Sequence, residues 1–413
     1  MNSNADHLYD VLIVGAGPAG CACAYKLAGK GLKIALIDKD RFPRDKICGD
    51  AVSPDVVNQL SRIDPELGAH FQQFREKKAT SGIRFFAPNT QHLDIVFNNF
   101  KYPNAKGYII KRLDFDDFLF QQVSRFSDID IYQEHKVADI QRAEDHLLLH
   151  TKQRVFRAKV IVGADGAYSV VNKQLSDNTI DKEHYSAGLR QYYENVKGFH
   201  ENSYIELHFY KEILPGYFWI FPLENNRANV GLGMLSSEVI KRDINLKKQL
   251  DHIIQNHPNV KDRFKEAKPL ESVKGFGLPM GSKRRSCSGD RFLLLGDAAS
   301  LIDPFSGEGI GMAIRSARLA ADHLLEAFKI NRFDAAYNLQ YDEAVYSKMW
   351  FELSFGRTLQ RLMQHPSAFN LMMKIAHKSS SFQSMLTYIL DNRDFSWANF
   401  NPFKSLKRRA KQN

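Results

Sequence analysis

The chain is poor in cysteine, with four in 413 residues, and none stands at the spacing of a disulfide framework or a zinc site. Cys21 and Cys23 are two positions apart in a segment expected to be helical, so their side chains should point in different directions. Cys48 and Cys287 are isolated. The sequence therefore predicts neither disulfides nor a metal, and Cys48 has to be interpreted from its surroundings.

Long apolar runs are also missing. No stretch of about 18 apolar residues occurs, so we expect no membrane-spanning helix. The start, MNSNADHLYD, lacks the basic and then apolar segments of a secretory signal, which predicts a cytoplasmic location. The formal net charge is +10, but no nucleic-acid-binding motif accompanies it, so nucleic acid is not an expected partner.

Part of the positive charge lies in the last residues, at Lys404, Lys407, Arg408, Arg409 and Lys411. A basic end of this kind is either a solvated tail or a contact with an anionic membrane surface, and the sequence leaves both interpretations open.

The sequence predicts buried strands at the start of the chain and at two later places. Residues 9–15, YDVLIVG, form a continuous apolar run that ends in glycine, typical of a strand buried on both faces. A helix to about residue 31 and a second strand, KIALID, follow, and similar strands end in VIVG at 160–163 and RFLLLG at 291–296. From about 186 to 280 the strands are aromatic and β-branched, which predicts a largely antiparallel sheet inserted into a parallel one.

A glycine motif, GAGPAG at 15–20, stands between the first strand and its helix. Gly15 allows the tight turn, Gly17 lets the backbone approach a pyrophosphate, and Gly20 lets helix and strand pack closely. The helix N-terminus also offers free N–H groups. Asp38 ends the next strand, where a carboxylate accepts hydrogen bonds from a ribose diol. The pattern predicts a dinucleotide without distinguishing NAD from FAD.

Two further segments end buried strands in the same way. Asp165 and Gly166 follow VIVG, a pair that on its own is a common β-turn. Asp297 ends the strand RFLLLG, and the long helix after it opens with three glycines: Gly307, Gly309 and Gly311. A glycine-lined helix start can bring backbone N–H groups against negative charge. Three such features on one parallel sheet indicate one shared ligand.

This trio of segments resembles that of FAD-dependent oxidoreductases with the p-hydroxybenzoate hydroxylase fold, and the resemblance implies FAD as the cofactor. In that family Glu is more common where this chain has Asp38. The resemblance implies that Arg112 serves the ribityl–pyrophosphate stretch, Asp297 the ribityl chain, and the turn 304–309 the flavin pyrimidine edge. The implied cofactor-binding residues are Gly15, Gly17, Ala19, Gly20, Asp38, Lys39, Arg44, Cys48, Gly49, Arg112, Asp165, Gly166, Gly296, Asp297, Pro304, Gly307, Gly309 and Ile310.

The expected fold class is α/β, with a discontinuous Rossmann-like FAD-binding domain, an inserted and mainly antiparallel β-sheet substrate domain, and a C-terminal helical region with a basic tail. The expected ranges are 1–75, 108–180 and 281–343 for the FAD-binding domain, 76–107 and 181–280 for the sheet domain, and 344–413 for the helical region. No second G-x-G-x-x-G follows a strand, so the reductant, NAD(P)H or a reduced redox protein, is expected to dock transiently.

Two stretches narrow the resemblance. Pro43 and Cys48 stand in a P-x-x-x-x-C-G arrangement, and YFWIFP at 217–222 is followed after eight residues by GLG at 231–233. Both are similar to the geranylgeranyl reductase family, whose members hydrogenate carbon–carbon double bonds of prenyl chains on lipids, diphosphates or quinones. The resemblance places Cys48 beside the flavin ring, facing a prenyl-lipid substrate.

The chemistry of such a reaction indicates which residues are catalytic candidates. Reduced flavin delivers hydride to one alkene carbon and the other needs a proton, so positioning and a proton donor must carry catalysis. Tyr217, Trp219 and Phe221 alternate along a strand and share one face, and with Pro222 we expect them to bind substrate, although plain sheet core is the alternative. Cys48, Tyr217 and Trp219 are the catalytic candidates. The Cys48 thiol positions the alkene, relays the proton, or is an inert core thiol, and the sequence leaves these three alternatives open.

Other interpretations stay open at this level. Arg44 and Lys46 either contact FAD or are solvated loop charges, and His208 is expected to be structural. An aromatic hydroxylase would leave Cys48 and the 217–233 motif unexplained. A halogenase would have Trp where Tyr217 stands and would need a catalytic lysine that we cannot locate. A flavin-bearing prenyl-lipid carrier or sensor is the non-enzymatic alternative.

Overall fold

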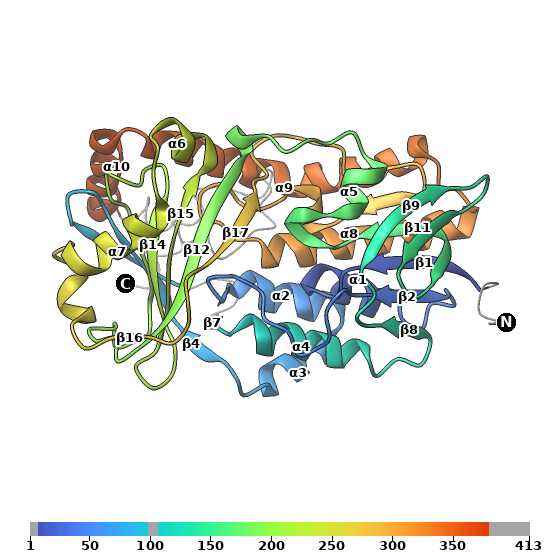
Figure 1. Ribbon diagram of the computed structural model, residues 1–413, viewed down its shortest axis with the longest axis horizontal. Coiled ribbons are helices and arrows are strands. Elements are labelled where there is room, and N and C mark those ends of the chain that lie inside the picture. Colours follow the sequence, from blue (N-terminus) through green and yellow to red (C-terminus); the bar gives the residue numbers. More distant parts are fainter. Residues whose placement is uncertain (1–6, 98–105, 380–413) are drawn as a thin grey trace, which may run out of the picture.

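A computed structural model describes residues 7–97 and 106–379 of the chain (Figure 1). This part contains two sheets of eight strands and one of three. Its helices are α1 (Pro18–Leu27), α2 (Pro54–Ile63), α3 (Pro65–Gln73), α4 (Arg112–Val123), α5 (Val170–Leu175), α6 (Ser236–Lys241), α7 (Leu246–Asn256), α8 (Ile310–Ile330), α9 (Ala335–Met363) and α10 (Pro366–Lys378).

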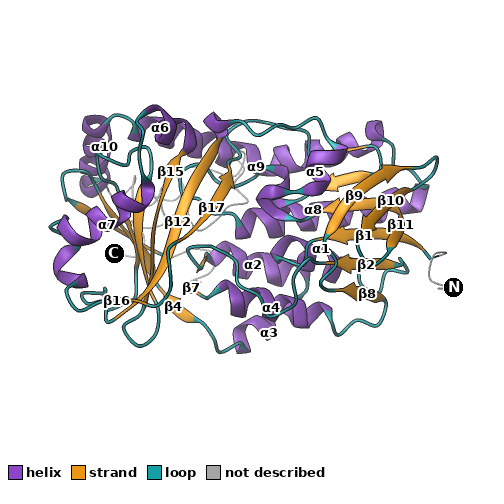
Figure 2. Ribbon diagram, viewed as in Figure 1, coloured by secondary structure: helices purple, strands orange, loops and turns teal. Residues whose placement is uncertain are grey.

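The first sheet contains the predicted parallel strands, at the right of Figure 1. Its strands are β1 (Leu8–Val14), β2 (Ile34–Ile37), β8 (Ile129–Tyr132), β9 (Val137–Arg142), β10 (Leu147–Thr151), β11 (Val155–Gly163), β18 (Ser288–Gly289) and β19 (Phe292–Leu294). The order β19-β11-β1-β2-β8 is parallel, and β1 pairs on both edges, with β2 and β11. The apolar run of β1 is buried as predicted, because β1 shares one core with α1, α8 and the β9–β10 hairpin; helices and strands of this half are coloured in Figure 2.

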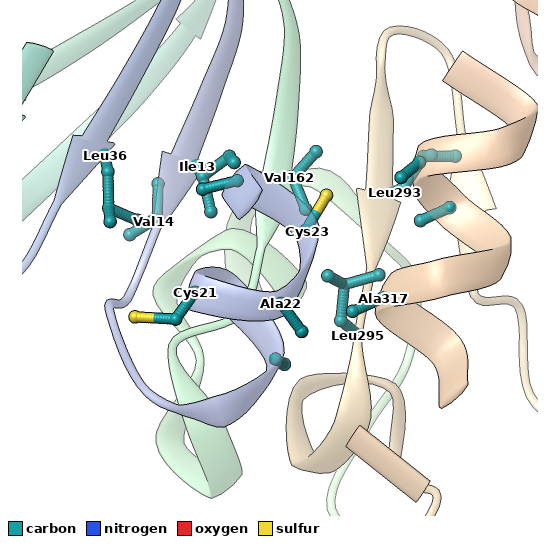
Figure 3. Packing of buried hydrophobic residues seen from close by; sticks show 14 of the residues in the cluster. Ile13, Val14, Cys21, Ala22, Cys23, Leu36, Val162, Leu293, Leu295 and Ala317 are labelled. Carbon is teal, nitrogen blue, oxygen red and sulfur yellow. The ribbon is translucent and has the colours of Figure 1, made fainter. Parts of the chain in front are cut away.

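Helix α1 packs between the first sheet and α8, as Figure 3 shows. Its small residues, among them Ala22, allow the close approach to Leu295 and Ala317. Cys21 and Cys23 point away from each other, and both are buried free thiols. The prediction of separate, unbridged cysteines is confirmed for this pair.

The second sheet is aromatic and lies at the left of Figure 1. Its strands are β5 (Gly82–Phe86), β6 (His92–Val96), β12 (Tyr185–Glu194), β13 (Ile205–His208), β14 (Tyr217–Pro222), β15 (Ala228–Leu235), β16 (Lys268–Pro269) and β17 (Lys274–Pro279). All pairs are antiparallel except β13 with β5. Phe218 and Ile220 pack in one core with α7, whereas Tyr217, Trp219 and Phe221 belong to the core on the opposite face.

A small sheet connects the two halves. It contains β3 (Ala51–Val52), β4 (Lys78–Thr80) and β7 (Gly107–Ile109), with β7 in the middle. Strand β3 continues the Cys48 loop, and β7 leads into α4. Of the segment 76–107, assigned from the sequence to the substrate domain, β5 and β6 join the aromatic sheet, while β4 and β7 belong to this small sheet.

Two helix boundaries differ from the sequence-based expectation. The boundary drawn at residue 344 falls inside α9, a continuous helix of 29 residues. Tyr341 of α9 belongs to the core of the first sheet and Met363, the last residue of α9, to the core of the aromatic sheet, so one helix packs against both halves. Helix α8 begins at Ile310 rather than near Gly307, whose φ of +71° is not helical.

Within residues 7–97 and 106–379, no helix is both long and apolar enough to cross a membrane. The basic cluster at 404–413 lies outside the described residues, so its two interpretations stay as they were.

Candidate active site

A cavity of about 720 Å³ is lined by residues of both large sheets and by the loops that join them, a size typical of cofactor and ligand sites. It brings most of the predicted site residues together. These are Gly15, Gly17, Ala19, Asp38, Lys39, Arg44, Cys48, Gly49, Arg112, Asp165, Gly166, Tyr217, Trp219, Phe221, Asp297, Pro304, Gly307, Gly309 and Ile310. Three predicted residues do not line it: Gly20, Pro222 and Gly296.

The glycine motif forms one end of this cavity. Gly15 has a φ of +99°, and a Cβ there would lie 2.4 Å from the Ala164 carbonyl oxygen. A Cβ on Gly17 would meet only the Arg44 guanidinium, at 3.4 Å, so open space lies in front of it. No side chain caps the first turn of α1. This is a cradle with room and free backbone N–H groups, which fits the pyrophosphate of a dinucleotide.

Gly20 and Gly296 serve packing rather than the cavity surface. A Cβ on Gly20 would lie 1.8 Å from the Gly15 carbonyl oxygen, in agreement with the close packing expected at this position. A Cβ on Gly296 would lie 2.9 Å from that of Ala313 on α8. Neither residue offers a contact to a ligand.

Asp38 is 7% exposed at the end of β2. Its Oδ2 accepts from the Ala16 N–H at 2.7 Å and its Oδ1 from the Asp40 N–H at 2.9 Å. Burial raises the pKa of Asp38, while Arg44 and the two N–H groups lower it. Each carboxylate oxygen keeps a second acceptor site, as a ribose diol requires.

The Asp165 carboxylate, unlike that of Asp38, is engaged in hydrogen bonds with the start of α5. Its oxygens accept from the Ser169 hydroxyl and from the N–H groups of Val170 and Val171, so the side chain caps α5. The segment is a turn, because Gly166 has a φ of +78°, and it also lines the cavity.

Asp116 holds two arginines at the cavity wall. The fully buried carboxylate accepts two hydrogen bonds from Arg112, at 2.6 and 2.7 Å, and one from Arg44 at 2.7 Å. Burial alone would raise the pKa of Asp116, but the two guanidinium groups outweigh it and hold that pKa below its usual range. Sequence analysis missed Asp116, which belongs to no motif, although its i, i+4 spacing from Arg112 is a signal for such a pair.

Replacing Asp116 by Asn is expected to lower the free energy of unfolding by about 3 kcal/mol, because it leaves two partly or fully buried cations without a countercharge. Urea denaturation of the apoprotein at neutral pH measures this. Asp117→Asn is the matched control, since Asp117 accepts only from Gln121 on an exposed surface. The difference from the unmodified chain should shrink as the pH falls through the low pKa of Asp116, where the ion pair is lost. Equal midpoints for both variants would contradict the assignment.

The Cys48 loop packs against the aromatic strand β14. Cys48 is partly buried and lines the cavity, whereas the other three cysteines are fully buried. A Cβ on Gly49 would lie 2.8 Å from the Phe221 ring, so only glycine fits this contact. Lys46 also lines the cavity, with its ammonium 3.5 Å from the centroid of the Phe276 ring, and burial lowers the pKa of Lys46.

Arg112 links this loop to α4. Burial alone would lower the pKa of its guanidinium, but Asp116 and the neighbouring Cys48 side chain raise it above the ordinary value. The guanidinium therefore stays charged beside the thiol-bearing loop.

The opposite lobe of the cavity is apolar. Tyr217, Trp219 and Phe221 follow one another along β14, with ring centroids 6.1 Å apart at each step. The Tyr217 hydroxyl donates to the Ser306 carbonyl, which ties β14 to the 304–309 turn. The remaining apolar lining includes Ile83, Phe85, Ile205, Leu207 and Phe305.

Pro222 does not belong to this set. It is the residue after Phe221, so its side chain lies on the other face of β14, and it does not line the cavity. The expectation that Pro222 binds substrate is therefore withdrawn. His208 is also outside: it is fully buried between Glu206 and Tyr210. In the described ranges, no three side chains of metal-ligating type gather in one place.

Comparisons with known proteins agree with the fold and the cavity. A family model described as FAD binding domain matches residues 8–381. The chain is 30% identical over 326 residues to digeranylgeranylglycerophospholipid reductase 2 of Methanosphaera stadtmanae, covering 78% of each chain. It is 27% identical over 409 residues to a menaquinone reductase of Mycolicibacterium smegmatis, covering 95% and 92%. A geranylgeranyl bacteriochlorophyll reductase-like structure from Thermoplasma acidophilum superposes with a TM-score of 0.80 at 22% identity, covering 97% and 99%.

The fold and the cavity thus define a FAD-dependent oxidoreductase, and the α/β class and the cofactor expected from the sequence are confirmed. The chain belongs to the geranylgeranyl reductase family. The glycine cradle, Asp38, Arg44 and Arg112 line this cavity with groups whose chemistry suits a dinucleotide.

Proposed function

We propose that the protein reduces carbon–carbon double bonds of a prenyl chain carried by a lipid, a diphosphate or a quinone. The observation that carries this proposal is a single cavity that joins a dinucleotide cradle to an aromatic lobe, with the Cys48 loop packed against that lobe. The relatives named as digeranylgeranylglycerophospholipid reductase and menaquinone reductase support it, since both substrates carry prenyl chains.

The apolar lobe suits a chain without polar handles. Its rings and branched side chains exclude water and hold the chain by contact area alone. A second apolar cavity of about 50 Å³ adjoins it, sharing Phe85, Phe305 and Ser306 with the first. Its lining continues with Leu93, Ile95, Leu359, Phe369 and Met373, among others. We infer that this extension receives part of the chain beyond the reacting bond.

Reduced FAD supplies the hydride when it is bound. The protein has to hold the alkene and provide a proton. The Tyr217 hydroxyl donates to the Ser306 carbonyl, and the Trp219 N–H donates to Asn229 at 2.9 Å, so both protons are engaged within the protein. Of the three catalytic candidates, Cys48 is therefore the one we assign to proton transfer, with Tyr217 and Trp219 shaping the substrate wall.

Anaerobic mixing of dithionite-reduced protein with geranylgeranyl lipids, geranylgeranyl diphosphate and menaquinones tests the function. We expect products heavier by two hydrogens for each reduced bond, detected by mass spectrometry. Photoreduction of the flavin in place of dithionite controls for direct chemical reduction. Products that form only with oxygen would indicate a hydroxylase or halogenase, and binding without product would indicate a carrier or sensor.

We also propose that electrons arrive from NAD(P)H or from a reduced redox protein that docks transiently, since the sequence offers one dinucleotide motif and we assign it to FAD. Steady-state flavin reduction by each donor, followed by absorbance, distinguishes the two.

A further inference from the structure

Asn229 on β15 connects the Cys48 loop to the aromatic strand. Its side chain is fully buried. The amide oxygen accepts from the Trp219 indole N–H at 2.9 Å, and the amide nitrogen donates to the Cys48 carbonyl and to Asp50 Oδ2, both at 2.8 Å. One amide therefore ties both sides of the cavity lobe together, although Asn229 does not line the cavity itself.

Asp50 is the second part of this network and is also fully buried. Besides Asn229, the Tyr192 hydroxyl donates to its Oδ2 at 2.5 Å and the Arg112 N–H to its Oδ1 at 3.3 Å. Arg190 adds positive charge nearby, over the Tyr192 ring at 4.1 Å. All three partners are donors, and an ionised carboxylate, which only accepts, satisfies them without placing a proton of its own among them.

The backbone at Asp50 has a conformation that needs this support. Its φ of +68° is in the left-handed region, which is unfavourable for a residue with a side chain. The Asp50 carbonyl accepts from the Ile110 N–H at 2.9 Å, and the carboxylate is held as described above. The Cys48 loop thus keeps its course because buried hydrogen bonds fix the residue two positions after the thiol.

We propose that Asn229 and ionised Asp50 are positioning residues that fix Cys48 opposite the aromatic strand. Both act through Cys48 and Trp219, since neither reaches the cavity surface. The effect on turnover rests on the proposed function, whereas the effect on the loop does not.

The network has a defined pH dependence. Burial raises the pKa of Asp50 to about 6, against the opposing effects of Tyr192, Asn229, Arg190 and the Arg112 N–H. Below this pH the carboxyl gains a proton among groups that donate to it, so its hydrogen bonds to the loop weaken. Because the folded pKa lies above the ordinary value, protonation itself favours the folded state. A fall in activity below about pH 6 would therefore indicate weakened hydrogen bonds around Asp50. It would not indicate unfolding caused by the loss of the Asp50 charge.

Asn229→Leu tests the positioning role, since leucine fills a similar volume and removes both polar ends. We expect alkylation of Cys48 by iodoacetamide to become about tenfold faster, because the loop opens locally. The other three cysteines are fully buried, so peptide mass spectrometry reads Cys48 selectively in the FAD-loaded protein. With substrate, kcat should fall by about 100-fold with little change in KM, as misplaced reacting groups require.

Asn338→Leu is the matched control. Asn338 is also a buried asparagine whose amide nitrogen donates to two backbone carbonyls, those of Gly289 and Phe333, but it does not line or adjoin the cavity. It should lose stability in a similar way and leave the Cys48 alkylation rate and kcat unchanged. An alkylation rate in folded Asn229→Leu at or below that of the unmodified protein overturns the proposal.

Asp50→Asn provides a second, isosteric test that does not depend on Asn229→Leu folding. It keeps an acceptor for Tyr192 and Asn229 and removes the titrating group. The unmodified protein and Asn338→Leu should lose kcat below about pH 6, and Asp50→Asn should not show this acid limb. An acid limb that persists at the same pH in Asp50→Asn overturns the role of ionisation. If no prenyl compound is reduced but Asn229→Leu still exposes Cys48, the proposed function fails and the positioning role stands.

Discussion

Replacing Cys48 by alanine is expected to reduce turnover of a prenyl substrate by about 100-fold or more, the usual contribution of a positioned proton donor. The loop that carries the thiol packs against Phe221, and the other two candidate donors are engaged with Ser306 and Asn229. No other group of the lobe is therefore assigned to this proton. Cys48→Ser should retain part of the activity, because a hydroxyl can still relay a proton from a less favourable position.

Single-turnover reduction under anaerobic conditions measures this, with FAD content determined from the visible flavin absorbance of each variant. Cys287→Ala is the control, since Cys287 is fully buried outside the cavity and its loss should leave turnover unchanged. Unchanged turnover of Cys48→Ala with normal FAD content would show that the thiol is an inert part of the wall.

A pair of glycine variants separates cofactor binding from folding. Gly17 has an ordinary φ of −74°, and a methyl group there would meet only a flexible guanidinium. Gly17→Ala should therefore leave the apoprotein as stable as before. Its FAD affinity should fall by about 10- to 100-fold, because the methyl group occupies space that the pyrophosphate needs, an overpacking cost of about 1–3 kcal/mol. Titration of the apoprotein with FAD, followed by flavin fluorescence, measures this.

Gly20→Ala, in contrast, should lower the stability of the apoprotein. Its methyl group would lie 1.8 Å from the Gly15 carbonyl oxygen, so α1 must move from β1 and the free energy of unfolding should fall by about 3 kcal/mol. Urea denaturation of the two apoproteins compares them. Equal loss of stability in both variants, or unchanged FAD affinity in Gly17→Ala, would contradict the division of roles within the motif.

Patterns of a few neighbouring residues predicted those parts of the structure that depend on neighbouring residues. The apolar side chains of β1 indicate a buried strand, and the backbone freedom of the glycines in the first turn indicates a tight turn. The shared face of Tyr217, Trp219 and Phe221 follows from the two-residue period of a strand. The same period should have excluded Pro222, and the motif match led to its inclusion.

The buried polar residues were not predictable in this way. Asn229 and Asp50 stand in no periodic pattern, and Asn229 donates to a carbonyl 181 positions away. Such a pair is decided by how two lobes pack, which no spacing in the chain encodes. Asp116 has only its i, i+4 spacing from Arg112 as a signal, and that spacing does not predict the contact with Arg44. The boundary drawn near residue 344 lies inside α9 for a related reason: a helical pattern does not say which lobe each of its turns contacts.

The sequence by itself determined a dinucleotide-binding α/β protein, because the first part of the cradle depends on glycine positions and a strand end that lie close together in the chain. The resemblance of its motifs to known families added FAD and the geranylgeranyl reductase family. Only the tertiary structure decided that the Cys48 loop packs against the aromatic strand. The thiol-bearing loop lies 181 positions from Asn229 of the β14–β15 pair, and the packing of the two lobes brings them together.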